Sequence, residues 1–151
     1  MNKQIFNFRF LVSSVAVLLL VMGTAQSTFA ADMDKKHKVV IQVSTDDPRT
    51  QKIALNNAVN LQKLLGVDNV AIEIVAYGPG LGLLTKKSKQ TKRVKSLALQ
   101  DITFSACGNT MAKVKKKTGK DVQLTEGVTT VQAGVARIME LQEQGYSYIR
   151  P

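Results

Sequence analysis

The chain has 151 residues, a formal net charge of +10 and 5% aromatic residues, with no Trp. Its single cysteine excludes an internal disulfide, and its single histidine has no neighbours at metal-ligand spacing, so we predict no metal site. The positive charge would suit a nucleic-acid binder, but the scarcity of rings for base stacking argues against one.

Residues 1–30 have the pattern of an export signal. Lys3 and Arg9 give a basic start, residues 11–23 are apolar or small, and Thr28-Phe29-Ala30 predicts cleavage after Ala30. The apolar stretch is shorter than the roughly 20 residues of a spanning helix, so we expect no membrane span after cleavage. We expect a periplasmic protein, and export argues further against nucleic acid. Loss of the two cations lowers the charge from +10 to +8.

The predicted domain covers residues 39–151 and follows a polar leader, residues 31–38, which we expect to be flexible. His37 lies in this leader and is predicted to be solvated. A β-branched run at residues 38–44 predicts the first strand. Asp47 before Pro48 then predicts the start of a helix.

That first helix is predicted to end at Gly66, a residue type favoured just after a helix end. Its apolar side chains recur at helical spacing: Ile53, Leu55, Ala58, Val59, Leu61, Leu64 and Leu65. Residues 70–76 predict the second strand. Asn56, Asn57 and Asn60 are interpreted as the polar face of the helix.

The middle of the chain combines a polar stretch with apolar segments. Residues 85–93 contain no apolar side chain and predict a loop or an exposed turn, whereas Val94, Leu97 and Ala98 can form one buried stripe. Residues 102–106 predict the third strand. Residues 109–117 predict a short helix that ends at Gly119.

Residues 128–131 predict a fourth strand by β-branching, although the spacing of Val128, Val131 and Val135 would also fit a helix. A helix is predicted over residues 133–144, with Val135, Ile138 and Met139 facing inward, followed by a last strand at 146–150. Five strands separated by four helical segments predict an α/β sandwich with a mainly parallel sheet.

In such sheets, ligands and catalytic groups gather beyond the carboxyl ends of the strands. The segments expected there are residues 44–47, 77–80 and 107–110, together with Gln132. Cys107 therefore lies at this edge, at the start of a helix.

A helix start favours a thiolate, because its unpaired backbone N–H groups and dipole stabilise negative charge. Such positions can lower a cysteine pKa from ~8.5 to ~7 or below. Gly108 would leave the sulfur approachable, and Asn109 and Thr110 can cap the turn or hold an anion. The alternative is that Cys107 is a small hydrophobic residue buried at the end of its strand.

The glycine-rich run at residues 77–82, YGPGLG, follows the second strand. It lacks the third glycine of the dinucleotide fingerprint, since Leu83 stands at that position, and no phosphate-loop lysine follows. We therefore predict no cofactor. We expect a tight turn in which Gly78, Pro79 and Gly80 form one wall of a pocket around Cys107.

Five segments, in order, resemble the DsrE/DsrF-like family in its exported single-domain branch: KVVIQVSTDD, ALNNAVNLQKLLG, VAIEIVAYGPGLGLL, ITFSACGNTM and VQAGVARIMELQEQGYSYIRP. The resemblance implies a three-layer α/β/α fold with a five-stranded parallel sheet, and assembly into trimers or hexamers. In the sulfur-relay members a cysteine beside the sheet edge accepts sulfur as a persulfide and passes it on. That role falls on Cys107. The best-understood relatives work in the cytoplasm with dedicated partners, which an exported chain would not reach.

Three hypotheses follow. In the first, the chain is a sulfur carrier that meets a thiol or sulfur-donor partner through Cys107. In the second, it is a non-catalytic module that binds a small anion or a protein, and Cys107 is structural. In the third, its main role is assembly into an oligomer. The sequence leaves open whether the lysine-rich segments, residues 86–95 and 113–120, face water, an anionic membrane surface or an acidic partner.

Overall fold

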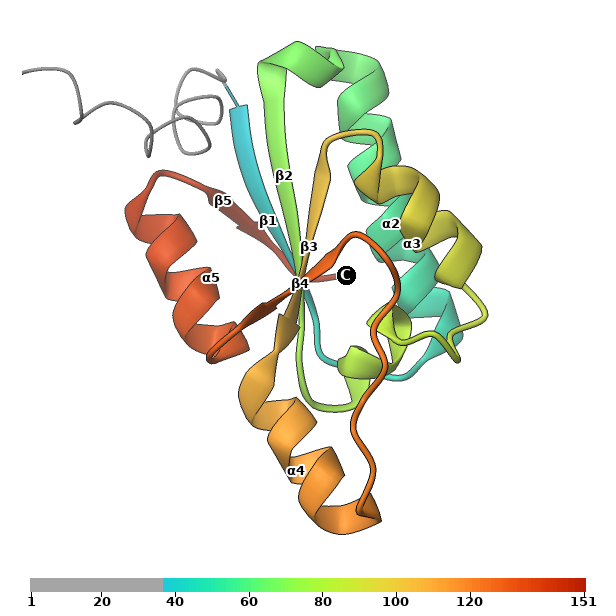
Figure 1. The fold of residues 1–151 in the computed structure, drawn as a ribbon. Helices are drawn as coiled ribbons and strands as arrows, with labels where there is room; N and C mark the ends of the chain where they lie inside the picture. Colours follow the sequence, from blue (N-terminus) through green and yellow to red (C-terminus); the bar gives the residue numbers. More distant parts are fainter. Residues whose placement is uncertain (1–36) are drawn as a thin grey trace, which may run out of the picture. The chain divides into compact units, whose positions relative to one another are not determined.

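The structure, a computed structural model, describes residues 37–151 (Figure 1). The predicted export signal and most of the predicted leader lie outside the described residues. The last two leader residues, His37 and Lys38, begin strand β1 (His37–Val43), and His37 is exposed as expected. Within residues 37–151, no helix is long and apolar enough to cross a membrane.

The sheet confirms the predicted fold class. Strands β1, β2 (Val70–Ala76), β3 (Ile102–Cys107), β4 (Val128–Val131) and β5 (Ser147–Ile149) lie in the order β4-β3-β2-β1-β5, and every neighbouring pair is parallel. Ala76 at the end of β2 is level with Val43 on one side and Ala106 on the other. The three central strands therefore end together, which brings the segments after them to one edge.

Helices cover both faces of the sheet (Figure 1). Helices α2 (Pro48–Leu65) and α3 (Thr91–Ala98) pack on one face over the larger core, and α5 (Gly134–Glu143) packs on the other over a smaller one. Helix α4 (Gly108–Thr118) extends from the carboxyl end of β3. Short 3-10 helices, η1 (Val67–Asn69) and η2 (Gly78–Leu84), complete the described elements.

Helix α2 begins as predicted, and its predicted apolar stripe faces the core except at two positions. The Thr50 N–H donates to the Asp47 carboxylate at 2.7 Å, and Pro48 is the first helical residue. Ile53 and Leu64 are exposed, whereas Gln51 and Gln62 are buried. The buried glutamine amides donate to backbone carbonyls of neighbouring loops, which makes their burial tolerable.

Helix α5 corrects the prediction about its inward face. Ile138 and Leu141 are buried, but Val135 is 67% exposed and Met139 57% exposed. The rotation of the helix is fixed by Gly134, which packs against the sheet edge, and by Arg137, which reaches down to β2. Residues 134, 137, 138 and 141 share one helical face, so Val135 and Met139 turn outward.

Candidate functional site

Cys107 is the last residue of β3 and the N-cap of α4, as the sequence predicted. Only 5% of its surface is exposed. Its register partner on β4 is Val131. The thiol therefore lies at the carboxyl edge of the sheet, almost covered by the segments that meet there.

Thr110 joins two of the predicted site segments. Its hydroxyl oxygen accepts a hydrogen bond of 3.0 Å from the Gly78 N–H, and the same hydroxyl interacts with the Cys107 sulfur. Gly78 adopts φ +54°, a conformation that favours glycine. The turn after β2 and the first turn of α4 are thus held together around the cysteine.

Gly80 has a packing role. A Cβ atom at this position would lie 2.1 Å from the Val43 carbonyl oxygen, so only glycine lets the turn approach the end of β1 this closely. Pro79 beside it is exposed. Gly80 therefore sets the position of the turn that carries Gly78.

Gly108 and Asn109 attach α4 to the end of β4. A Cβ atom at Gly108 would lie 3.1 Å from the Val131 carbonyl oxygen, and the Asn109 N–H donates to the Gln132 carbonyl at 3.1 Å. This contact brings the segment after β4 against the first turn of α4. The chain then turns into α5.

Gly134, the first residue of α5, is a site residue that the sequence analysis missed. A Cβ atom on it would lie 3.3 Å from the Cys107 Cβ and 3.1 Å from two atoms of Tyr77. Its backbone N–H is one of the groups that interact with the cysteine sulfur. The only signal in the sequence was a glycine at the start of a predicted helix, which does not say what the helix approaches.

Cys107 therefore lies between the N-termini of two helices, α4 and α5. Burial raises the pKa of its thiol, but the Thr110 hydroxyl and the backbone N–H groups of Gly134, Thr110 and Asn109 act in the opposite direction. The donors outweigh burial, and the pKa lies below its usual value. A lowered pKa increases the thiolate fraction at a given pH, and the thiolate is the nucleophilic form of cysteine.

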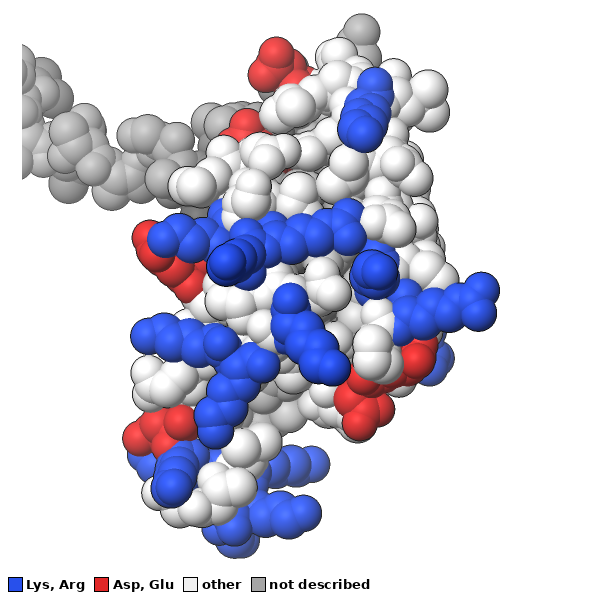
Figure 2. Space-filling model, turned by 90° about the vertical axis from the view of Figure 1, so that its right-hand side faces the viewer, with Lys and Arg blue, Asp and Glu red and all other residues white. Residues whose placement is uncertain are grey.

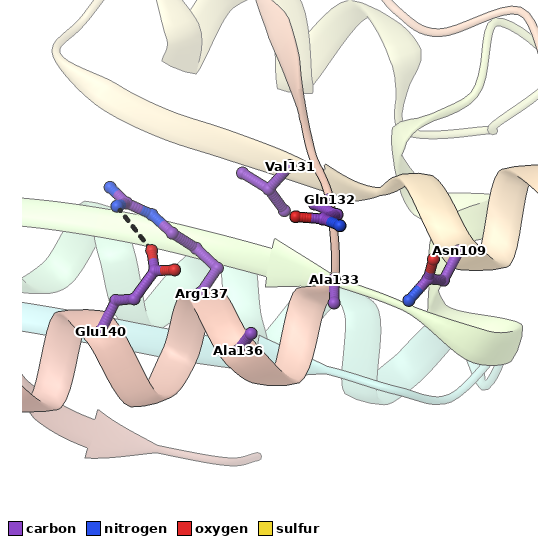
Figure 3. Close-up of a pocket in the computed structure, with 7 residues that line it drawn as sticks. All are labelled: Asn109, Val131, Gln132, Ala133, Ala136, Arg137 and Glu140. Atoms are coloured by element: carbon purple, nitrogen blue, oxygen red, sulfur yellow. Dashed lines mark hydrogen bonds and ion pairs between the residues drawn. The ribbon is translucent and has the colours of Figure 1, made fainter.

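A pocket of about 460 Å³ lies beside this edge, along α5 (Figure 3). Arg137 and Glu140 project from α5 at one end, and Asn109 of α4 stands at the other. The lining residues are Asn109, Val131, Gln132, Ala133, Ala136, Arg137 and Glu140. Of the residues expected at this edge, Asn109 and Gln132 belong to this set, and Gly78, Pro79 and Gly80 do not.

A buried acid holds α5 to the sheet. Glu73 on β2 is 3% exposed, and its carboxylate accepts hydrogen bonds from Arg137 Nε at 2.9 Å, Arg137 Nη2 at 2.7 Å and the Ser105 hydroxyl at 2.6 Å. The carboxylate raises the pKa of the Arg137 guanidinium. The sequence pattern predicts a strand over residues 70–76 and assigns no role to Glu73.

In the described part of the chain, no three His, Cys, Asp or Glu side chains are grouped so that they could hold a metal ion. The chemistry of the edge comes from one thiol, backbone N–H groups and uncharged hydroxyl and amide side chains.

The DsrE/DsrF-like family model matches residues 37–151. Among solved structures, the protein of unknown function MTH1491 from Methanobacterium thermoautotrophicum is 36% identical, with a TM-score of 0.68 over 76% of this chain and 99% of that chain. The ychN protein from E. coli is 11% identical, with a TM-score of 0.60 over 78% of this chain and 99% of that chain, a likeness that shows the fold alone. No curated protein sequence matches the chain.

Proposed function

The chain belongs to the DsrE/DsrF-like family, and from this premise we propose that it is a sulfur carrier in which Cys107 holds a sulfane sulfur as a persulfide. The observation that carries the proposal is the setting of the thiol between the N-termini of α4 and α5, which lowers its pKa. The same groups would stabilise the anionic terminal sulfur of a persulfide.

The loading step is a sulfur transfer without net oxidation. The Cys107 thiolate attacks a terminal sulfur of a polysulfide chain, a new S–S bond forms, and the electron pair of the broken S–S bond leaves with the shortened polysulfide dianion. An acceptor thiolate then attacks the outer sulfur of the Cys107 persulfide. This restores the Cys107 thiolate and leaves the persulfide on the acceptor.

The near burial of Cys107 restricts the donor. With 5% of the residue exposed, a small linear donor suits the site better than a protein disulfide, whose backbone would have to reach the sulfur past Gly134 and Tyr77. We therefore propose an inorganic polysulfide or another small sulfane compound as the donor.

The test combines reactivity with mass. The alkylation rate of Cys107 is measured against pH, and intact mass is recorded before and after exposure to polysulfide. We expect a pKa below ~8.5 and a reducible mass gain of about 32 Da in the native protein only. A Cys107→Ser protein that still gains the same mass would overturn the proposal.

The proposed compartment is the periplasm, on the strength of the export pattern in residues 1–30. There the protein would meet donors and acceptors that differ from those of cytoplasmic relatives. N-terminal sequencing of the protein recovered from the periplasm should begin after Ala30. Recovery of an uncleaved chain in the cytoplasm would reject this part of the proposal.

A second candidate function is a non-catalytic module that binds a small anion or a protein segment in the pocket. The observation that favours it is the lining of the pocket, which includes Arg137 and Asn109 but not Cys107. It predicts slow alkylation of the nearly buried Cys107, and ligand-induced stabilisation that survives Cys107→Ala.

We also propose that the protein forms homo-oligomers, trimers or hexamers, through the outer side of α5. Val135 and Met139 are four residues apart on one helical face and are both largely exposed, so they form a small apolar surface on the outer side of α5. Sedimentation of the native protein and of V135S/M139S tests this assignment. A native monomer at micromolar concentration would contradict it.

A further inference from the structure

We propose that the lysine-rich segments, residues 86–95 and 113–120, form one basic face that binds an anionic phospholipid surface. The first segment holds six Lys or Arg and the second five, against six in the rest of residues 37–151, and neither segment contains an acid. The face drawn in Figure 2 carries many Lys and Arg side chains, with acids in small groups among them. This inference is independent of the sulfur chemistry proposed for Cys107.

The chain after α4 brings the two segments together. Leu124 forms an antiparallel bridge with Thr85, the Lys86 N–H donates to the Gln123 carbonyl at 2.9 Å, and the Thr125 N–H donates to the Leu84 carbonyl at 2.9 Å. The start of the first segment is therefore tied to the chain that leaves the second. Two clusters that are separate in the sequence become one surface.

Most of this charge is unpaired. In the described part of the chain, the ion pairs made by these segments are Lys95 with Glu126 and Lys115 with Asp121, and Arg93 donates to the Asn56 amide oxygen. In these two segments, the exposed lysines that make no ion pair within residues 37–151 are Lys86, Lys87, Lys89, Lys92, Lys113, Lys116, Lys117 and Lys120. Intramolecular pairing does not account for their concentration on one face.

The helix dipole explains only part of the pattern. Lys115, Lys116 and Lys117 occupy the last turn of α4, where positive charge is favourable. Lys87 and Lys89 lie between η2 and α3 and gain nothing from a helix end. These two lysines are exposed and available to a partner outside the chain.

The composition of the face indicates the kind of partner. Ten of its eleven cations are lysines, which are depleted in protein–protein interfaces, whereas arginine is enriched there because it pairs with carboxylates through two hydrogen bonds. Neither segment contains an aromatic residue on which a nucleic-acid base could stack. Flexible point charges spread over a broad face suit the diffuse negative charge of a lipid surface.

The second lysine segment lies at the opposite end of α4 from the thiol. Cys107 caps the first turn of α4, and the second lysine segment occupies the last turns of the same 11-residue helix and the residues after it. At a rise of about 1.5 Å per residue, the helix spans roughly 16 Å. Adsorption through the lysines would therefore leave Cys107 at the far end of the helix.

The test is binding of the purified protein to vesicles of phosphatidylglycerol mixed with phosphatidylcholine, compared with pure phosphatidylcholine, at low and high salt. The variants K87Q/K89Q and K116Q/K117Q remove two charges from each segment. K63Q/R150Q removes two charges from outside both segments. Circular dichroism and thermal unfolding establish that all three variants are folded.

We expect binding to the anionic vesicles only, weakened by salt. Each variant in the basic face should lower the partition coefficient by about tenfold or more, since each lysine near an anionic surface contributes roughly a factor of five. The control should stay within about twofold of the native protein, because distant charges are screened.

Three results would overturn the proposal. Equal binding to neutral vesicles would indicate an apolar contact, and anionic binding unchanged in both test variants would place the contact elsewhere. Variants that lose affinity for duplex DNA or for an acidic protein, while vesicle binding is absent, would assign the face to that other class of partner.

Discussion

Gly134 and Cys107 are in direct contact across the carboxyl edge of the sheet: a Cβ atom on Gly134 would lie 3.3 Å from the Cys107 Cβ. The first residue of α5 is thus packed on the cysteine that caps α4. This contact allows the N-termini of two helices to act on one sulfur.

Gly134→Ala is therefore expected to raise the pKa of Cys107 and to destabilise the fold. The added methyl group must displace Tyr77 or move α5 outward, and overpacking of this kind costs about 1–3 kcal/mol. Alkylation against pH and urea unfolding measure the two effects. Gly82→Ala is the matched control, because a Cβ atom there meets nothing within 4 Å. An unchanged thiol pKa in Gly134→Ala would show that α5 does not tune the thiol.

Thr110→Val is expected to slow alkylation of Cys107 severalfold at pH 7. The variant keeps the shape of the side chain but removes the hydroxyl that lowers the pKa of the thiol. It also leaves the Gly78 N–H without its acceptor, which should reduce stability by about 1 kcal/mol. Thr110→Ser keeps the hydroxyl and should retain most of the native rate. Equal rates in the two variants would rule out a role for the hydroxyl.

The stability of the native protein relative to Cys107→Ala should increase with pH on the alkaline side of neutrality. The folded state lowers the pKa of the thiol, so between the folded pKa and the unfolded value of ~8.5 the native state has lost a proton that the unfolded state still holds. The contribution of the thiol to the free energy of unfolding is complete above the pKa of the unfolded state, and it is lost as the pH falls through the pKa of the folded state. Urea unfolding of both proteins from pH 5 to 9.5 gives the difference, and a flat or falling difference would contradict the lowered pKa.

Arg137→Met is expected to destabilise the protein by about 3–5 kcal/mol, because it leaves the Glu73 carboxylate buried without its cation. The double variant E73Q/R137M should recover much of this loss. Glu140→Gln is the control, since Glu140 is exposed and its contact with Arg137 is 3.5 Å long, and it should cost at most about 1 kcal/mol. A double variant no more stable than Arg137→Met would show that the buried charge is not the cause.

Arg137→Met also tests whether the Glu73–Arg137 pair holds α5 in position beside Cys107. If this pair keeps Gly134 against Cys107, Arg137→Met should raise the pKa of the thiol as well as lower stability. A change in stability without a change in the thiol pKa would limit the pair to a structural role.

Local patterns in the sequence were enough to predict the fold class and the place of Cys107. Strand and helix signals alternate along the chain, and the glycines at 66 and 119 end α2 and α4 as predicted. These features depend on neighbours within a few residues, and so they can be predicted without the tertiary structure.

The inward faces of the helices were predicted less well. Apolar spacing alone placed Val135 and Met139 inside, but the rotation of α5 follows from the packing of Gly134 and from the reach of Arg137 to a buried acid on β2. A short amphipathic helix has several apolar stripes of similar strength, and long-range contacts choose between them.

The sequence by itself determined that a lone thiol would end a strand and begin a helix at the carboxyl edge of a parallel sheet. Only the tertiary structure decided what surrounds that thiol. The strand order places β4 beside β3, so the chain that leaves β4 must turn into α5 next to Cys107. The second helix N-terminus, the Thr110–Gly78 hydrogen bond and the Glu73–Arg137 pair join residues 27 to 64 positions apart, and such contacts form only when the sheet has brought its strands together.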